Sequence, residues 1–424
     1  MRLSDTFTRQ KRELPPPPGP IRMYFCGPTV YQRIHVGNAF ATTVLPLWLK
    51  RWLTLRGYET KVAVNITDIN DKIYDAAPGE SAQLAADATR WYVEDTDRLG
   101  LGRPDVEPTA TETVPDQIRM IEQLIAAAFA YEVQGDVYFS VSQFPEYGRL
   151  SGQRLDKLEE QEPNAIKDDQ RDFALWKANK PEEDTWWDSP WGRGRPGWHI
   201  ECSAMSEKHL GVEFEIHGGG LDLVFPHHEN EIAQSHALGH PYAQLWMHNG
   251  MLSLGGHEMH KSLGNDVSLK NALEEWGRET LLLFYMTGHW RKPLDFSDGT
   301  LRAAAARADR FREVLRAPSQ PLGESGWARF ESALDEDFNT PDALAVMHEW
   351  RDHDLLRRAL DVFGLASLAS DVEPPPEVAG LARRRQDARA TNDFAEADRL
   401  RAEIEAAGWE VRDDPDGFRL VPRS

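Results

Sequence analysis

Buried strands and an amphipathic helix alternate at the start of the chain. The apolar run "IRMYFCG" (21–27) is typical of a buried strand, and residues 36–56 carry apolar positions at helical spacing up to Gly57, a natural C-terminal cap. Pro46 is an interior flaw in this helix. A second buried strand, "KVAVNI" (61–66), follows. This order predicts an α/β fold of Rossmann type with a parallel sheet, and a nucleotide is expected where the strand order reverses.

The same pattern divides the rest of the chain. Residues 111–193 mix helical segments with runs such as "GDVYFSVSQF" and look inserted between two halves of the nucleotide fold. The strand pattern resumes with "GWHIECSAM", "EFEIHGGGLDLVF" and "AQLWMHNGML", and a helical region runs from 301 to about 368. Prolines 374–376 predict a linker. The last segment predicts a helix with Ala397, Leu400 and Ile404 on one face and Gly408 as its stop, then a hairpin over "WEVRDDPDGFRLV".

Composition narrows the class of protein. With 424 residues, 41% of them hydrophobic, the chain has enough apolar surface for two to four domains. No run approaches the ~20 apolar residues of a membrane span, and the first residues lack the apolar core of a signal peptide, so we expect a cytoplasmic protein with no membrane partner. The net charge of −21 repels polyanions, so a nucleic acid requires a local basic patch. Tail arginines are the candidates, although a solvated helix with paired acids fits equally well: Arg383, Arg384, Arg385, Arg389, Arg399 and Arg401.

The stretch "FPHHENEIAQ" (225–234) raises the possibility of a metal site. His227 and Glu231, four residues apart, project from one face of a helix, so an imidazole and a carboxylate can reach one ion. Cys26 and Cys202, the only two cysteines, complete a zinc-like donor set if the strand ends that carry them meet that helix. The alternative is two buried cysteines beside a solvated acidic helix start. His228 and Glu229 are expected around the ion or at the surface.

Two short stretches are candidates for nucleotide binding. "HVGN" (35–38) begins the first helix after the first strand, where backbone amides and the helix dipole favour a phosphate and Gly37 permits a close approach. A helix cap explains the same residues equally well. In "HKSLGN" (260–265), Lys261 is placed to reach phosphates, although a lone loop lysine is commonly a solvated charge.

Several longer stretches, in order along almost the whole chain, carry a family resemblance. They are "RMYFCGPTVYQRIHVGNA", "NITDINDKI", "DFALWKA", "RPGWHIECSAM", "IHGGGLDLVFPHHENEIAQS", "WMHNGML", "KSLGN" and "NDFAEADRLR". Together they resemble the class I aminoacyl-tRNA synthetases and, among these, the cysteinyl-tRNA synthetase family. The resemblance implies a Rossmann catalytic domain in two halves (1–110 and 194–255) split by a connective insertion (111–193). A stem-contact segment (256–318), a helical bundle (319–370) and an anticodon-side domain (371–424) follow.

The resemblance implies a function for the metal. One zinc ion held by Cys26, Cys202, His227 and Glu231 would select the thiol of L-cysteine. Rejecting serine ten-thousandfold requires about 5.5 kcal/mol, whereas fitting a side chain into a pocket supplies only ~1–3 kcal/mol. A thiol that binds the metal loses its proton and forms a metal–thiolate bond, which the far less acidic hydroxyl of serine cannot match, and this supplies the difference. By the same resemblance, four residues line the amino-acid pocket, with the last one pairing the substrate ammonium: Thr67, Trp198, His217 and Asp222.

The implied reaction uses ATP with Mg2+ to form a cysteinyl-adenylate and then acylates tRNA(Cys). His35 and Asn38 would contact the triphosphate together with Gly27 and Gly37, and Lys261 would hold the leaving phosphates. The family's KMSKS stretch here is "EMHKS" (258–262), so Lys261 is expected to act alone or with a protonated His260. A monomer is expected.

Two other functions fit parts of the sequence. A mycothiol-type cysteine ligase keeps the zinc and ATP sites but passes cysteine to an amino sugar. The tail from Arg383 onward, "CGPTVY" and "HVGN" favour the synthetase. An inactive paralogue that binds tRNA or zinc is suggested only by Glu258 and His260. A secondary sulfur-transfer activity is not expected, because the lysine-rich stretches keep few lysines.

Overall fold

A computed structural model describes residues 1–154, 164–255, 257–258, 267–370, 374–391, 393–414 and 417–422. The chain divides into two compact units, Met1–Leu365 and Ala366–Ser424.

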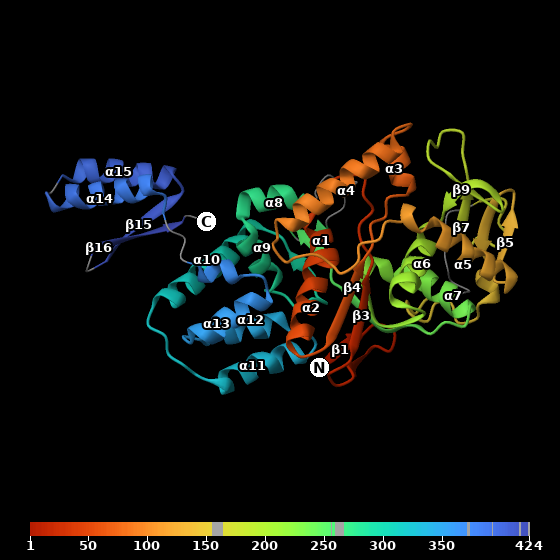
Figure 1. The fold of residues 1–424 in the computed structure, drawn as a ribbon, viewed down its shortest axis with the longest axis horizontal. Coiled ribbons are helices and arrows are strands. Elements are labelled where there is room, and N and C mark those ends of the chain that lie inside the picture. The colour runs from red at the N-terminus through yellow and green to blue at the C-terminus, as the bar shows by residue number, and fades with distance from the viewer. Residues whose placement is uncertain are drawn as a thin grey trace. The chain divides into compact units, whose positions relative to one another are not determined.

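A parallel four-stranded sheet forms the centre of the first unit (Figure 1). Its order is β11 (Tyr242–Asn249), β10 (Glu213–Gly220), β3 (Pro20–Phe25) and β4 (Glu59–Val64), and every pair in it is parallel. The register places Tyr24 opposite Ala63 and His217. The central strands are buried on both faces because helices cover the sheet, as their uninterrupted apolar runs predict.

The helix between β3 and β4 is built in three parts. A short α1 (Val36–Ala39) passes into a π-helical turn, η1 (Phe40–Val44), and then into α2 (Leu45–Leu55). Pro46 therefore lies in the first turn of α2, where a missing N–H costs little, instead of being a flaw inside one helix. Gly57, with φ of 88°, ends the helix as predicted.

The insertion has its own antiparallel sheet, of order β5 (Ala130–Val133), β6 (Asp136–Phe139), β7 (Phe173–Ala178), β9 (Gly192–Pro196) and β8 (Trp187–Ser189). Before it come α3 (Asp71–Ala76), α4 (Ser81–Asp97) and α5 (Val114–Ala126). Helix α6 (Trp198–Leu210) contacts both sheets (Figure 1). One apolar core runs through Tyr24 of β3, Ile200 of α6 and Trp176 of β7, so the insertion packs firmly against the parallel sheet.

The prediction of a strand over "GWHIECSAM" was wrong, because these residues belong to α6. Every residue from His199 to Ser206 is buried. A helix buried on all sides has no amphipathic period, so its sequence is indistinguishable from a buried strand.

The rest of the first unit supports this core. A hairpin of β1 (Arg2–Asp5) and β2 (Gln10–Glu13) begins it, and β12 (Leu252–Leu254), β13 (His257–Glu258) and β14 (Leu294–Asp295) form a small sheet. The helices are α7 (Glu229–Ala237), α8 (Leu269–Trp276), α9 (Arg278–Tyr285), α10 (Asp298–Arg316), α11 (Glu324–Asp335), α12 (Thr340–Glu349) and α13 (His353–Val362). None of the helices in the described ranges has the length and hydropathy needed to cross a bilayer.

The second unit contains α14 (Pro376–Ala390), α15 (Phe394–Ala406) and a hairpin of β15 (Trp409–Asp414) and β16 (Gly417–Pro422). The predicted face of α15, with Ala397, Leu400 and Ile404, is buried. The apolar core of this unit also contains Trp409 and Val378. A small helical pair closed by a hairpin therefore has a core of its own.

Candidate active site

Four buried side chains from three regions of the sequence meet at one edge of the parallel sheet. Cys26 follows β3, Cys202 lies in α6, His227 in the π-helical turn η6 (Val224–His228) and Glu231 in α7. Their donor atoms all lie within 4.8 Å of one another. Cys202 reaches the cluster from a helix and not from a strand end, because α6 passes beside the end of β3.

The distances fit a tetrahedral ion. Cys26 Sγ lies 3.7 Å from Cys202 Sγ and 3.5 Å from Glu231 Oε1, and His227 Nε2 lies 3.1 Å from the same Oε1. Zinc bonds of about 2.0–2.3 Å place neighbouring ligand atoms about 3.3–3.8 Å apart, so the two sulfur distances lie in this range and the nitrogen–oxygen distance lies just below it. Two sulfurs, an imidazole and a carboxylate are also the donor types that zinc prefers. The residues present therefore fit such an ion.

The charges of these groups depend strongly on burial. Burial raises the pKa of the Cys26 thiol well above its usual range, and the neighbouring Cys202 adds to this. Burial alone would raise the pKa of Glu231, but His217 and His227 outweigh it and lower that pKa. Burial lowers the pKa of His227 to about 4, so this imidazole is neutral at pH 7 and able to bind a metal. A divalent cation would favour the thiolate forms that burial disfavours.

A second donor set overlaps the first. Cys26 and Glu231 also lie near His217 and His228, and these four donors again fall within 4.8 Å of one another. His217 Nε2 lies 2.8 Å from Glu231 Oε2, and His228 Nε2 lies 3.3 Å from Cys26 Sγ. Of the two positions expected for His228, the structure shows the one beside the metal donors and not the one at the surface, because its side chain is fully buried. Glu229 is also buried, and its carboxylate accepts hydrogen bonds from the backbone of Gly148 and Ser151.

A cavity of about 490 Å³ borders this cluster and collects most of the residues expected to bind substrates. The cluster reaches the cavity through Cys26. The other expected residues in its wall are Gly27, His35, Gly37, Asn38, Trp198 and Asp222. Thr67 and His217 do not line it; both are buried, with the Thr67 hydroxyl accepting from Asn65 at 3.0 Å. Lys261 and His260 lie outside the described residues, as does the Glu258 side chain.

The amides at the start of α1 are used differently from the expectation. His35 is the N-cap, and its Nδ1 accepts from Gly37 N at 3.1 Å and Asn38 N at 3.2 Å. These two N–H groups therefore cap the helix in this structure, as the capping alternative predicts. His35, Gly37 and Asn38 all line the cavity.

Sequence reasoning missed part of this cavity. Asn249 and Gly250 line it at the carboxyl end of β11, and Thr29 and Tyr31 line it after β3. Ligands of open α/β sheets bind at the carboxyl ends of the strands, so the residues directly after each predicted strand were the available signal.

The tail arginines do not form the expected basic side as a set. Arg385 is buried, with 3% of its surface exposed. Arg399 pairs with Glu396 at 2.7 Å and with Glu403, and Arg401 pairs with Glu405 at 3.2 Å. The alternative of arginines paired with acids therefore describes Arg399 and Arg401.

Comparison with known proteins identifies the family. Residues 15–306 match the model described as tRNA synthetases class I (C) catalytic domain, residues 329–353 a DALR domain, and residues 371–419 the cysteinyl-tRNA ligase anticodon binding domain. A cysteine–tRNA ligase of Halorhodospira halophila is 42% identical, with 99% of each chain covered. The chain belongs to the cysteine–tRNA ligase family. A second member, from Geobacillus thermodenitrificans, is 40% identical and covers 99% of this chain and 98% of its own.

This member of the cysteine–tRNA ligase family shares its fold with enzymes of low sequence identity. A Mycobacterium tuberculosis methionyl-tRNA synthetase in complex with methionyl-adenylate superposes with a TM-score of 0.59 at 13% identity, over 82% of this chain and 88% of that one. The shared architecture is the class I catalytic fold with its parallel sheet.

Proposed function

We propose that this protein attaches L-cysteine to tRNA(Cys) in two steps, through a cysteinyl-adenylate formed from ATP with Mg2+. The observation that carries the proposal is the meeting of Cys26, Cys202, His227 and Glu231, with Cys26 in the wall of the 490 Å³ cavity. Family membership over the full chain supports the same reaction.

One zinc ion per chain, held by these four residues, is part of the proposal. When bound, zinc would act as a Lewis acid that binds the sulfur of cysteine more strongly than the oxygen of serine. Discrimination of ten-thousandfold corresponds to about 5.5 kcal/mol, more than a pocket that only fits the side chain provides.

The chain's own residues position the substrates. Asp222 lines the cavity and is proposed to pair the substrate ammonium, and Trp198 closes its side. His35 and Asn38 are proposed to orient the triphosphate, and Lys261 to hold the departing phosphates. A monomer acting in the cytoplasm remains our prediction.

The matched anticodon binding domain at residues 371–419 favours tRNA over an amino sugar as acceptor, which argues against the mycothiol-type ligase. An inactive paralogue is the remaining alternative. Cysteine-dependent exchange of pyrophosphate into ATP separates it from an active enzyme.

The decisive experiment is aminoacylation of a transcribed tRNA pool, with cysteine against serine, before and after zinc removal. We expect transfer of cysteine alone and its loss on chelation, with recovery when zinc returns. Cys202→Ser should lower bound zinc and cysteine activation together. Full discrimination against serine by protein stripped of metal would contradict the proposal.

A further inference from the structure

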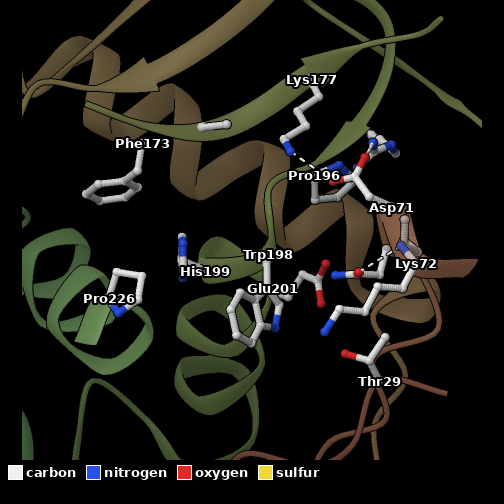
Figure 2. Close-up of a pocket in the computed structure, with 14 residues that line it drawn as sticks. Thr29, Asp71, Lys72, Phe173, Lys177, Pro196, Trp198, His199, Glu201 and Pro226 are labelled. Carbon is white, nitrogen blue, oxygen red and sulfur yellow. Dashed lines mark hydrogen bonds and ion pairs between the residues drawn. The ribbon is translucent and has the colours of Figure 1, made fainter. Parts of the chain in front are cut away.

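A second cavity of about 400 Å³ adjoins the first (Figure 2). Its wall comes from β7, β9, α3 and α6, where the insertion meets the parallel-sheet part of the unit. It shares Thr29, Lys72 and Trp198 with the 490 Å³ cavity. A molecule in the second cavity therefore lies next to whatever is activated in the first, which is the position that an acyl acceptor needs.

Its cations differ in how they are held. Lys177 Nζ lies 3.0 Å from Asp71, and Arg195 pairs with Asp71 and with Glu183 at 3.0 Å. No carboxylate of the described ranges lies within ion-pair distance of Lys72, whose side chain is exposed. Lys72 is thus the wall cation available to an incoming phosphate.

The side chain of Glu201 offers a hydrogen-bond acceptor to a ligand in this cavity. Its side chain is buried, with 1% exposed, and its Oε2 has no hydrogen-bond partner among the described residues. In Figure 2 its carboxyl group and the Lys72 amine point toward the same space beside the Trp198 ring. A buried oxygen without a partner costs free energy, and a ligand N–H would remove that cost.

Trp198 offers a stacking surface. One face of its ring lies on His227, with centroids 4.1 Å apart and planes 26° apart. The side chain is nevertheless 36% exposed and lines both cavities. An exposed indole beside a cation and a carboxyl acceptor suits a nucleobase, which has a flat face and N–H donors on its edge.

We propose that this second cavity receives the terminal nucleoside of the tRNA, with Glu201 accepting a hydrogen bond from the exocyclic amino group of its base and Lys72 holding its phosphate. The inference rests on the proposed function. In this proposal Glu201 recognises the acceptor end of the tRNA. It is neither one of the four zinc donors nor a residue that lines the 490 Å³ cavity.

The test is a cycle of protein and RNA changes, measured as single-turnover transfer from preformed enzyme-bound adenylate. The tRNA ends either in adenosine or in purine riboside, which lacks the amino group. The protein is the parent, Glu201→Gln or Glu201→Met; glutamine keeps an acceptor oxygen in place and methionine does not. Lys72→Ala is compared with Lys61→Ala, because Lys61 lies on β4, donates to His209 O at 2.8 Å and lines neither cavity.

We expect purine riboside to slow transfer by the parent about fivefold to a hundredfold. The glutamine variant should keep that sensitivity, and the methionine variant should be slow with both RNAs and indifferent to the amino group. Lys72→Ala should slow transfer and Lys61→Ala should not. Equal sensitivity of the parent and the methionine variant overturns the inference. A parent that charges no tRNA at all refutes the proposed function instead.

Discussion

The Tyr242 hydroxyl donates to Glu231 Oε2 at 2.6 Å, and His217 Nε2 lies 2.8 Å from the same oxygen. The other oxygen, Oε1, faces His227 and Cys26. The carboxylate is therefore fixed on one side so that its second oxygen joins the metal donor set. Hydrogen bonds to ligating side chains of this kind fix their orientation.

Tyr242→Phe removes one of these fixing hydrogen bonds while keeping the ring. We expect zinc affinity to fall about tenfold to a hundredfold, since the loss of a partner of a metal ligand commonly costs that much. Competition with a chromogenic chelator measures it. Tyr138→Phe, which removes a hydroxyl bonded to Asp136 in the insertion, is the matched control and should leave affinity unchanged. Equal affinities for parent and Tyr242→Phe would refute this role.

Lys261→Ala tests the one lysine retained in the KMSKS-type stretch. Loss of a cation beside departing phosphates should lower the rate of cysteine-dependent pyrophosphate exchange about a hundredfold or more. Glu258→Lys restores the family's first lysine and should lower the KM for ATP, because an anion beside a polyphosphate is replaced by a cation. An exchange rate that is insensitive to Lys261→Ala would remove this loop from the ATP site.

His248 makes folding sensitive to acid. Burial, followed by the charge of His217, lowers its pKa to about 3, whereas an unfolded histidine has a pKa of about 6.5. As the pH falls below about 6.5, the unfolded chain binds a proton that the folded chain does not, so the free energy of unfolding falls by about 1.4 kcal/mol per pH unit. His248→Gln should reduce this slope between pH 6.5 and 5 in urea unfolding. An identical slope in both proteins would argue against it.

Gly27→Ala should destabilise the fold. A Cβ at Gly27 would lie 1.6 Å from the Asn65 carbonyl oxygen, so the ends of β3 and β4 would have to separate. Overpacking of this kind costs about 1–3 kcal/mol. Gly299→Ala is the control, because no atom of the described residues lies within 4 Å of its Cβ position and alanine suits the first turn of α10, so its stability should not fall. Thermal unfolding of both variants measures the difference. A Gly27→Ala protein as stable as the parent would show that these strand ends separate without cost.

Local pattern was enough for much of the architecture. The apolar runs of β3 and β4, the helix with Gly57 as its stop and the buried face of α15 follow from periodicity and capping, which act over a few residues. The i, i+4 relation of His227 and Glu231 is local for the same reason. The family motifs are also short stretches of sequence, and the expected reaction was inferred from them.

Only the tertiary structure decided how these pieces meet. Cys26 and Cys202 are 176 positions apart, and their sulfurs approach because α6 lies between two sheets, a long-range contact that no local period encodes. The Glu201 oxygen that lacks a partner in the described part of the chain, and the cavity that Glu201 lines, exist only once the insertion packs on the parallel sheet. Periodicity reports which face of a segment is buried; it does not report which distant segment buries it.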